Sequence, residues 1–410
     1  MQDGELYRRL MGLREPWKVV EVRVDFAGLK VDVWVEWVVE QQGVYPECGK
    51  TCRIYDHRKE RQWRHLDTMQ FQTIMHCRIP RVNCAEHGTK SMEMGWAEKN
   101  SRFTALFERL SIDVLLGCQN QTKVKELLKL SWDEVHLIQE KAVQRGFGRR
   151  VGGELRHLGV DEKSFLRGHR YVTVLSDLDN PRVLDVACDR REEFLEELVN
   201  KLWQQQRDQI TAVVLDMWGP FIHAVEQRLP RVDIVHDTFH IAKYLGEAVD
   251  KVRKKENRKF VKQDDDTLKG TKYLRLTNPN RWTELQEALF EELKDKGLKV
   301  GRAWSIKEMF SEFWEYRYEK AARNCFKKWY WWATHARLKP MAEVAKKLKR
   351  HLDNGLTYLN HRITNAAVEG LNSKIQQVKS AARGFRNFKN FRIAILFFCG
   401  KLDMHPQKSQ

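Results

Sequence analysis

The sequence predicts a multidomain α+β protein, and three changes of residue pattern along its 410 residues support that prediction. Apolar and polar residues alternate near the N-terminus, as is typical of half-buried strands. From residue 101 the apolar residues recur at three- and four-residue spacing, as is typical of helices. From residue 157 short strand-like and helix-like segments alternate. We therefore expect a strand-rich domain over 1–100, a helical domain over 101–156 and an α/β domain further on.

The composition is that of a basic chain with ample material for packed cores. Lys and Arg number 73 against 56 Asp and Glu, an excess of 17 positive charges, and 42% of the residues are hydrophobic. No uncharged apolar stretch reaches the roughly 18 to 20 residues that span a bilayer, and the N-terminus lacks the apolar core of a signal peptide. We expect a soluble, cytoplasmic protein with no membrane contact. The charge favours nucleic acid as a partner, although acidic proteins or membrane surfaces attract the same charge.

Two period-two runs over 19–26 and 29–38 predict the strands of the first domain, and a cluster of metal-binding residue types follows them. Two knuckles that bring thiolates and an imidazole to one tetrahedral ion make a zinc-ribbon-like domain. Tyr45 stands where the first ligand of the first knuckle is expected, so either Cys52 or Cys77 is a candidate for the missing thiolate. The alternative is a set of buried free cysteines. The candidate Zn²⁺ ligands are Cys48, Cys52, Cys77, Cys84 and His87.

The segment from Thr122 to Lys141 predicts a helix-turn-helix, in which Ser131 caps the second helix. An ordinary helical hairpin is the alternative, and the basic charge of the chain favours the DNA-binding interpretation. Lys123, Lys125 and Ser131 are then candidate DNA contacts.

The residue pattern of the α/β domain, which begins at residue 157, predicts seven elements. They are strands over 157–161, 171–176 and 182–187, a helix over 191–206, a strand over 210–216, a helix over 220–228 and a strand over 232–235. Three strands, helix, strand, helix, strand is the order of an RNase H-like sheet, in which the first and fourth strands are neighbours. Asp161 and Asp216 end those two strands. Each alone is more typical of a cap or a turn. As a pair, they repel each other unless divalent cations neutralise them. A pair of carboxylates that holds divalent cations is the arrangement that a two-metal phosphoryl-transfer site requires.

A third carboxylate is expected from an amphipathic helix that Asn365 caps. Leu371, Ile375, Val378 and Ala382 form its apolar stripe, while Glu369, Asn372, Gln376 and Arg383 fall on the opposite face. A solvent-exposed Glu is the alternative for Glu369. Asp237 and His240 follow the last strand, at the start of a helix, where a structural histidine is the alternative.

Four segments together resemble the signature blocks of bacterial insertion-sequence transposases of the ISL-three type. They are Gly159-Val-Asp161-Glu-Lys-Ser-Phe, Val213-Val-Leu-Asp216-Met-Trp, Val235-His-Asp237-Thr-Phe-His240 and Thr364-Asn-Ala-Ala-Val-Glu369-Gly-Leu-Asn-Ser-Lys-Ile. The resemblance covers nearly the whole chain. It implies a zinc-binding domain, a helix-turn-helix and a DDE catalytic domain over 157–256 plus 360–410, interrupted by an α-helical insertion over 257–359. Tyr45 departs from the family's first cysteine.

The resemblance implies that Asp161, Asp216 and Glu369 bind two Mg²⁺ or Mn²⁺ ions, and that Asp237, His240 and Asn372 support the site. The implied enzyme binds the terminal inverted repeats, cuts the element's ends and joins them to target DNA. Its implied partners are double-stranded DNA and further copies of itself, in the bacterial nucleoid. The competing functions are a zinc and helix-turn-helix regulator without catalysis, and an RNase H-like nuclease without strand transfer.

Two basic runs are candidate phosphate contacts, with a solvated surface as the alternative. The second run interleaves basic and aromatic residues, which suits unpaired DNA near a cut end. The candidate contacts in the two runs are Lys251, Arg253, Lys254, Lys255, Arg383, Arg386, Lys389 and Arg392.

Overall fold

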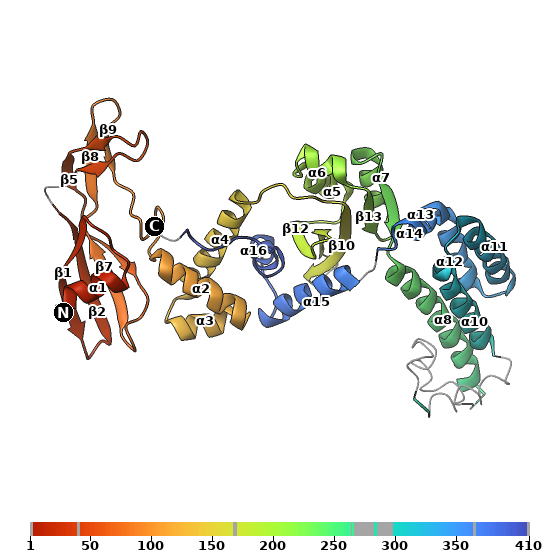
Figure 1. Ribbon diagram of the computed structural model, residues 1–410. Coiled ribbons are helices and arrows are strands. Elements are labelled where there is room, and N and C mark those ends of the chain that lie inside the picture. Colours follow the sequence, from red (N-terminus) through yellow and green to blue (C-terminus); the bar gives the residue numbers. More distant parts are fainter. Residues whose placement is uncertain are drawn as a thin grey trace. The chain divides into compact units, whose positions relative to one another are not determined.

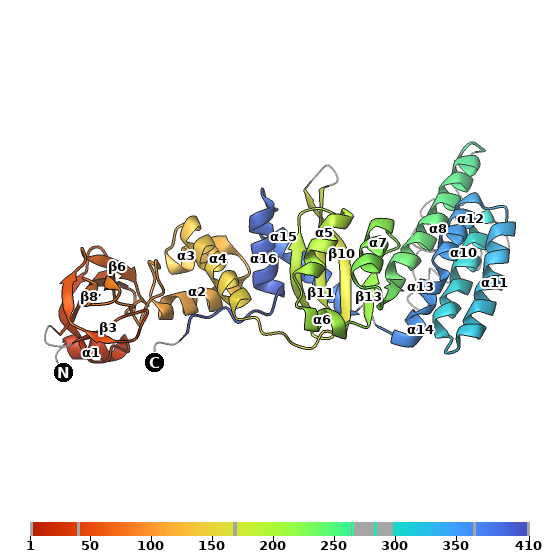
Figure 2. The same cartoon turned by 90° about the horizontal axis from the view of Figure 1, so that it is seen from above.

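The computed structural model describes residues 3–38, 42–166, 170–263, 265, 283–284, 298–363 and 366–407. The chain divides into two compact units. Figures 1 and 2 label their helices and strands. Unit 1 comprises residues 1–151, 378–383 and 393–410, and unit 2 comprises 152–377 and 384–392. The sequence predicts 360–410 as one piece of the α/β domain, whereas the last residues group with unit 1. The domain boundaries themselves stay a prediction.

Unit 1 begins with a four-stranded sheet of order β1-β2-β7-β6 and one helix. The elements are α1 (Asp3–Leu10), β1 (Trp17–Asp25), β2 (Lys30–Trp37), β6 (Arg61–Arg64) and β7 (Gln72–Cys77). The period-two pattern of β2 places Val31, Val33 and Val35 in the core. Tyr7 of α1 packs into the same core, which also contains Trp63.

Two small sheets follow the first strands of this unit and carry most of the clustered cysteines. One pairs β3 (Gly43–Val44) with β4 (Thr51–Cys52), and the other has the order β5-β8-β9. Its strands are β5 (Ile54–His57), β8 (Pro80–Cys84) and β9 (Gly88–Ser91). Tyr45, Val82 and Cys84 form their buried centre.

Three helices form the remainder of the N-terminal part of unit 1. They are α2 (Ala105–Cys118), α3 (Gln121–Leu128) and α4 (Trp132–Gly148). The Ser131 hydroxyl accepts a hydrogen bond from the Glu134 amide, and the Glu134 carboxylate accepts one from the Ser131 amide, so the predicted cap of α4 is a complete capping box. Lys129, with φ of 52°, ends α3 in the left-handed conformation and makes the turn without a glycine.

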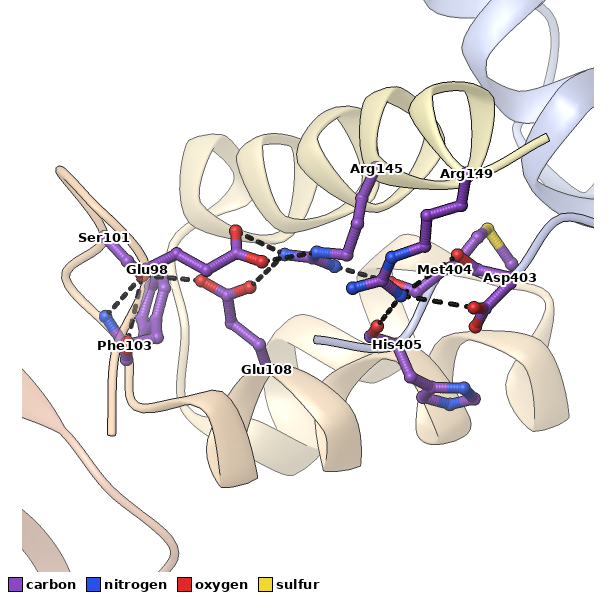
Figure 3. A network of polar contacts seen from close by, with 9 residues as sticks. All are labelled: Glu98, Ser101, Phe103, Glu108, Arg145, Arg149, Asp403, Met404 and His405. Atoms are coloured by element: carbon purple, nitrogen blue, oxygen red, sulfur yellow. Dashed lines mark hydrogen bonds and ion pairs between the residues drawn. The ribbon is translucent and has the colours of Figure 1, made fainter. Parts of the chain in front are cut away.

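A buried network of charges attaches the C-terminal tail to these helices (Figure 3). Arg145 of α4 lies 2.8 Å from Glu108 of α2 and 2.6 Å from Glu98, with side chains of Arg145 and Glu108 only 8% and 2% exposed. Arg145 also donates to the carbonyl oxygen of Met404. One turn along, Arg149 contacts the Asp403 carboxylate at 3.3 Å. These contacts explain why residues 393–410 group with unit 1.

Unit 2 contains a five-stranded sheet of order β12-β11-β10-β13-β14. Its strands are β10 (His157–Leu166), β11 (Arg170–Asp177), β12 (Arg182–Ala187), β13 (Ala212–Leu215) and β14 (Asp233–His236). The first three strands are antiparallel neighbours, while β10, β13 and β14 run parallel. The predicted adjacency of the first and fourth strands is therefore present in the structure.

Helices cover both faces of this sheet. One face packs on α5 (Glu192–Asn200) and α7 (Gly219–Arg228), and the other receives Val368 from α15 (Ala366–Ala381). The single helix predicted over 191–206 is instead α5 followed by α6 (Gln204–Gln209), because Trp203 is extended and its ring lies directly over Gly152.

A helical bundle follows the sheet in the chain (Figure 1). Its helices are α8 (Thr238–Val261), α10 (Lys299–Ser311), α11 (Glu319–His335), α12 (Lys339–Arg350), α13 (Leu352–Leu356) and α14 (Tyr358–His361), with a 3₁₀ turn over Glu312–Glu315. Trp329 is buried in its core, and its indole donates to the Ile306 carbonyl at 2.8 Å. The expected cap Asn365 lies outside the described residues. Among the described helices, none combines the length and apolarity needed to cross a bilayer.

We predict that Arg145→Met destabilises the α2–α4 helices by about 3–5 kcal/mol, because it leaves the buried Glu108 carboxylate without its positively charged partner and with only the Ser101 hydroxyl as a donor among the described residues. Urea denaturation combined with hydrogen exchange of the α2 and α4 amides measures this effect. Arg9→Met is the control, since Arg9 pairs with Glu5 at the surface and its loss should leave both measurements nearly unchanged. Equal behaviour of the two variants would contradict the assignment of this network.

Candidate active site and metal centre

Three carboxylates meet at one edge of the unit 2 sheet. Gly159 of β10 pairs with Val214 of β13, so Asp161 and Asp216 each lie two residues beyond that pair. Leu215 of β13 pairs with His236 of β14, so Asp237 lies level with Asp216. The parallel strands therefore bring three residues that are far apart in the sequence to the same level of the sheet. The prediction that Asp161 ends its strand is wrong, because β10 continues to Leu166 and stays paired with β11.

Asp161 is held by three donors. Its Oδ1 accepts from the Glu162 amide at 2.7 Å, and its Oδ2 accepts from Asn372 Nδ2 at 2.6 Å. Lys163 Nζ lies 2.9 Å from the same Oδ2. Lys163 faces Asp161 because residues two apart in a strand point to the same side. Asn372 comes from α15, so this helix contacts the candidate site directly.

Asp216 is held by the backbone and by a tyrosine. Its Oδ1 accepts from the Met217 amide at 2.6 Å, and its Oδ2 accepts from the Tyr244 hydroxyl at 2.7 Å. Burial, and secondarily the hydrogen bond to Asp216, raise the pKa of Tyr244, so its hydroxyl stays protonated and donates.

His240 lies between the three carboxylates. Its Nδ1 is 3.4 Å from Asp216 Oδ2, while its Nε2 is 4.0 Å from Asp161 Oδ1 and 3.8 Å from Asp237 Oδ2. Asp237 caps α8 by accepting from the Phe239 amide at 2.8 Å, which directs His240 to the sheet edge. Burial raises the pKa of Asp237, and the nearby His240 opposes that rise. The predicted pair therefore does lie on one side of a helix start.

Glu369 occupies a different position from the aspartates. It is exposed on α15 and lines a hollow of about 920 Å³ together with Thr238 and Phe239 of α8. Among the described residues, no three of Asp161, Asp216, Asp237, His240 and Glu369 have ligand atoms that all lie within 4.8 Å of one another. The structure thus joins Asp161, Asp216, Asp237, His240 and Asn372, and places Glu369 beside the start of α8.

The second candidate centre contains Cys48, Cys84 and His87, whose ligand atoms lie within 4.8 Å of one another. The Sγ atoms of Cys48 and Cys84 are 3.9 Å apart, and Cys84 Sγ is 3.4 Å from His87 Nδ1. The hydrogen bond from His87 is the main cause that lowers the pKa of the Cys84 thiol to about 7. Thiolates and imidazole at this spacing are ligands that Zn²⁺ prefers.

The other residues predicted around this centre separate into three cases. Tyr45 is fully buried and donates through its hydroxyl to the His87 carbonyl at 2.9 Å, so it supports the second knuckle instead of serving as a ligand. Cys52 packs against the Tyr45, Val82 and Cys84 cluster. Cys77 lies in the separate core of the four-stranded sheet, where burial raises its pKa to about 12. Cys77 is therefore removed from the candidate ligands.

The predicted DNA contacts differ in accessibility. Lys123, Lys125 and Ser131 are exposed. Of the first basic run, Lys251, Lys254 and Lys255 are exposed, while Arg253 is half-buried and pairs with Asp250 at 2.8 Å, as Lys254 does at 2.7 Å.

In the second basic run Arg383, Arg386 and Lys389 are exposed, whereas Arg392 donates to Asp185 at 2.7 Å. Two of the aromatic residues of this run pack on other rings. Phe391 is fully buried against Phe165, with ring centroids 5.4 Å apart, and Phe385 packs on Phe391. The interleaved pattern therefore reflects a packed core as well as a basic surface.

Sequence reasoning missed Lys163 and Tyr244. Tyr244 had a usable signal, since Asp237, His240 and Tyr244 are three and seven residues apart and so share one face of α8. Lys163 could have been found from the two-residue repeat of a strand, because a residue two positions after Asp161 points to the same face of the sheet.

Comparison with known proteins matches the two regions that contain these residues. A family model described as a transposase of the ISL3 type, with a DDE domain, matches residues 158–395, and a model described as the zinc-finger of transposases IS204, IS1001, IS1096 and IS1165 matches residues 46–87. The transposase for insertion sequence element IS1557 of Mycobacterium tuberculosis is 27% identical over 100% of both chains. The transposase for IS1001 of Bordetella parapertussis is 25% identical over 85% of this chain and 87% of its own.

We predict that Cys84→Ala loses bound zinc and Cys77→Ala keeps it, because Cys84 contacts both Cys48 and His87 while Cys77 lies in another core. The zinc content of the purified protein, measured per chain, gives the result. Thermal unfolding of Cys77→Ala checks that the variant is folded. Retention of zinc by Cys84→Ala, or its loss from folded Cys77→Ala, would refute this ligand assignment.

Proposed function

This chain belongs to the ISL3-type family of insertion-sequence transposases, and from that premise we propose that it cuts the ends of its element and joins them to target DNA at Asp161 and Asp216. The observation that carries the proposal is the register of β10 and β13, which brings Asp161 inside β10 level with Asp216 directly after β13. The strand order of this sheet supports an RNase H-like catalytic fold.

The residues present fit a divalent-metal site. Asp161 and Asp216 offer hard carboxylate oxygens, which Mg²⁺ and Mn²⁺ prefer. Glu369 is the proposed third carboxylate, since it lies on α15 one turn before Asn372, whose amide contacts Asp161. When bound, two such ions supply an activated nucleophile and neutralise the leaving oxygen of an in-line displacement.

The surrounding residues have distinct supporting roles in this proposal. Asn372 and Lys163 fix the orientation of the Asp161 carboxylate, and Tyr244 fixes that of Asp216. His240 places a titratable ring among three carboxylates, where it can hold a proton or donate to a DNA phosphate.

DNA binding is proposed for two parts of unit 1. The α3 and α4 helices, joined by a short turn with a complete capping box, support a helix-turn-helix that reads the terminal inverted repeats. Exposed Lys123 and Lys125 are its proposed phosphate contacts. The zinc domain adds a second surface. Synapsis of two ends requires at least two copies of the chain, so we propose a homo-oligomer on DNA.

The fourth zinc ligand is proposed to be Cys52. Cys48, Cys84 and His87 supply three ligands, and the buried Tyr45 directs its hydroxyl to a backbone carbonyl. Cys52 packs with Cys48 against the same buried centre, and the proximity of Cys84 contributes, after burial, to raising its pKa in the metal-free protein. Zinc binding would reverse that effect, because a coordinated thiol is deprotonated.

We predict that Asp161→Asn lowers cleavage of a labelled terminal-repeat DNA by roughly 10²–10³-fold or more while leaving end binding intact. The substitution removes one negative charge and keeps the shape, so metal binding suffers and the fold does not. Gel-shift and cleavage assays on the same preparation measure both properties. Normal cleavage by Asp161→Asn would exclude Asp161 as a catalytic residue, and a non-catalytic regulator would show no cleavage in either protein.

We also predict that the unmodified protein joins pre-cleaved terminal-repeat DNA to a target plasmid in Mg²⁺. Pre-cleaved ends carry the 3′-hydroxyl that acts as the nucleophile, so joining needs no prior cut. Joined products are separated from the target on a denaturing gel. A nuclease without strand transfer would nick the plasmid and give no joined product.

A further inference from the structure

The end of β13 is embedded in the helical bundle. Met217, which follows Asp216 directly, is buried in the same apolar cluster as Ile241 of α8, Phe310 of α10 and Leu348 of α12. The backbone amide of Met217 also donates to Asp216. The bundle core therefore fixes the chain immediately beside one of the two candidate metal ligands.

A second connection runs through side chains. The Tyr244 hydroxyl donates to Asp216 Oδ2 at 2.7 Å, and Lys347 Nζ of α12 lies 3.6 Å from the centroid of the Tyr244 ring. An ammonium at that distance over an aromatic face is attracted by the ring quadrupole. The three residues thus form a chain from the inserted helices to the sheet edge.

Lys347 lies in an unusual electrostatic position. Burial lowers its pKa, and the negative charge of Asp216 is the main influence that opposes this shift. No carboxylate of the described residues lies within ion-pair distance of its ammonium group, so the Tyr244 ring is its closest recorded partner. Such a half-buried cation would cost stability unless its interaction with Tyr244 and Asp216 offset the burial.

We propose that Tyr244 and Lys347 are positioning residues through which the inserted helical bundle holds the Asp216 carboxylate in the orientation that binds the metal. This inference rests on the proposed function, because it assigns Asp216 to the metal site. Neither residue needs to touch DNA. Tyr244 occupies one lone pair of Oδ2 and limits rotation of the carboxylate, while Lys347 fixes the ring that carries the hydroxyl. Residues that orient a metal ligand in this way typically affect metal affinity 10–100-fold.

The test compares Tyr244→Phe and Lys347→Met with the unmodified full chain. Tyr244→Phe removes the hydroxyl and keeps the ring, while Lys347→Met removes the charge and keeps most of the stem. Binding of Mn²⁺ to the protein without DNA is measured by electron paramagnetic resonance of the free ion. The Mg²⁺ concentration that gives half-maximal strand joining is measured in parallel. We expect Tyr244→Phe to raise the dissociation constant for Mn²⁺ and the half-maximal Mg²⁺ concentration by about 10-fold or more each. Lys347→Met should raise the same two quantities by a smaller factor.

Lys349→Met is the matched control. Lys349 lies on the same helix and covers another tyrosine, with its Nζ 4.8 Å from the Tyr330 ring centroid. It has no recorded contact with Asp216, so its substitution should leave Mn²⁺ binding and the Mg²⁺ requirement unchanged. Thermal unfolding of all three variants checks that each is folded.

The double variant Tyr244→Phe/Lys347→Met distinguishes a chain from two independent effects. If Lys347 acts through Tyr244, the double variant should require no more metal than Tyr244→Phe alone. Additive effects, or a folded Tyr244→Phe with unchanged Mn²⁺ binding, would overturn the inference. If the unmodified protein neither cleaves nor joins, the proposed function itself fails. If the unmodified protein cleaves and joins DNA and Asp161→Asn does neither, the proposed function stands. Unchanged metal binding by Tyr244→Phe would then refute only the inference about Tyr244 and Lys347.

Discussion

Repulsion between the carboxylates at the edge of the unit 2 sheet is the constraint on which the surrounding structure depends. Asp161 lies inside β10, Asp216 and Asp237 directly follow β13 and β14, and the register leaves the three level with one another. Without compensation this arrangement would favour protonation or separation of the groups. The compensation comes from every neighbouring element: Lys163 from β10, His240 and Tyr244 from α8, and Asn372 from α15. Each donor also orients the oxygen atom that it contacts.

This constraint gives the helical bundle a role beyond enlarging the protein. The helix that begins at Asp237 leaves the sheet edge, carries His240 and Tyr244 past the aspartates, and then continues into the bundle. Met217 is buried in the bundle core, and Lys347 covers the Tyr244 ring. The sheet supplies the two aspartates, whereas the bundle determines how firmly one of them is held. In unit 1 a comparable division separates the knuckles around Cys84 from the sheet core that contains Cys77.

Sequence patterns predicted that the first and fourth strands are neighbours and that Asp161 and Asp216 lie level on them, because both follow from local periodicity and chain topology. The sequence patterns failed where packing against distant parts of the chain determines the position of a side chain. Cys77 is equally close to the cluster in sequence, but the alternation of β7 turns it into an apolar core. The basic neighbours of Phe391 suggested a stacking residue, yet its ring packs on Phe165 of β10. Tyr244 was overlooked although it follows Asp237 and His240 at helical spacing, because that spacing does not reveal its contact with Asp216. Glu369 remains a prediction from its family motif and helix face.

Replacement of Asp216 by cysteine tests the central claim, that this residue is a metal ligand, most directly. A thiolate is a poor ligand for the hard Mg²⁺ ion, and softer divalent ions accept sulfur more readily. Strand joining by Asp216→Cys should therefore be abolished in Mg²⁺ and partly restored in Mn²⁺, while Asp216→Ala should be inactive in both. Equal activity of Asp216→Cys in the two metals, or restoration of Asp216→Ala by Mn²⁺, would contradict the account.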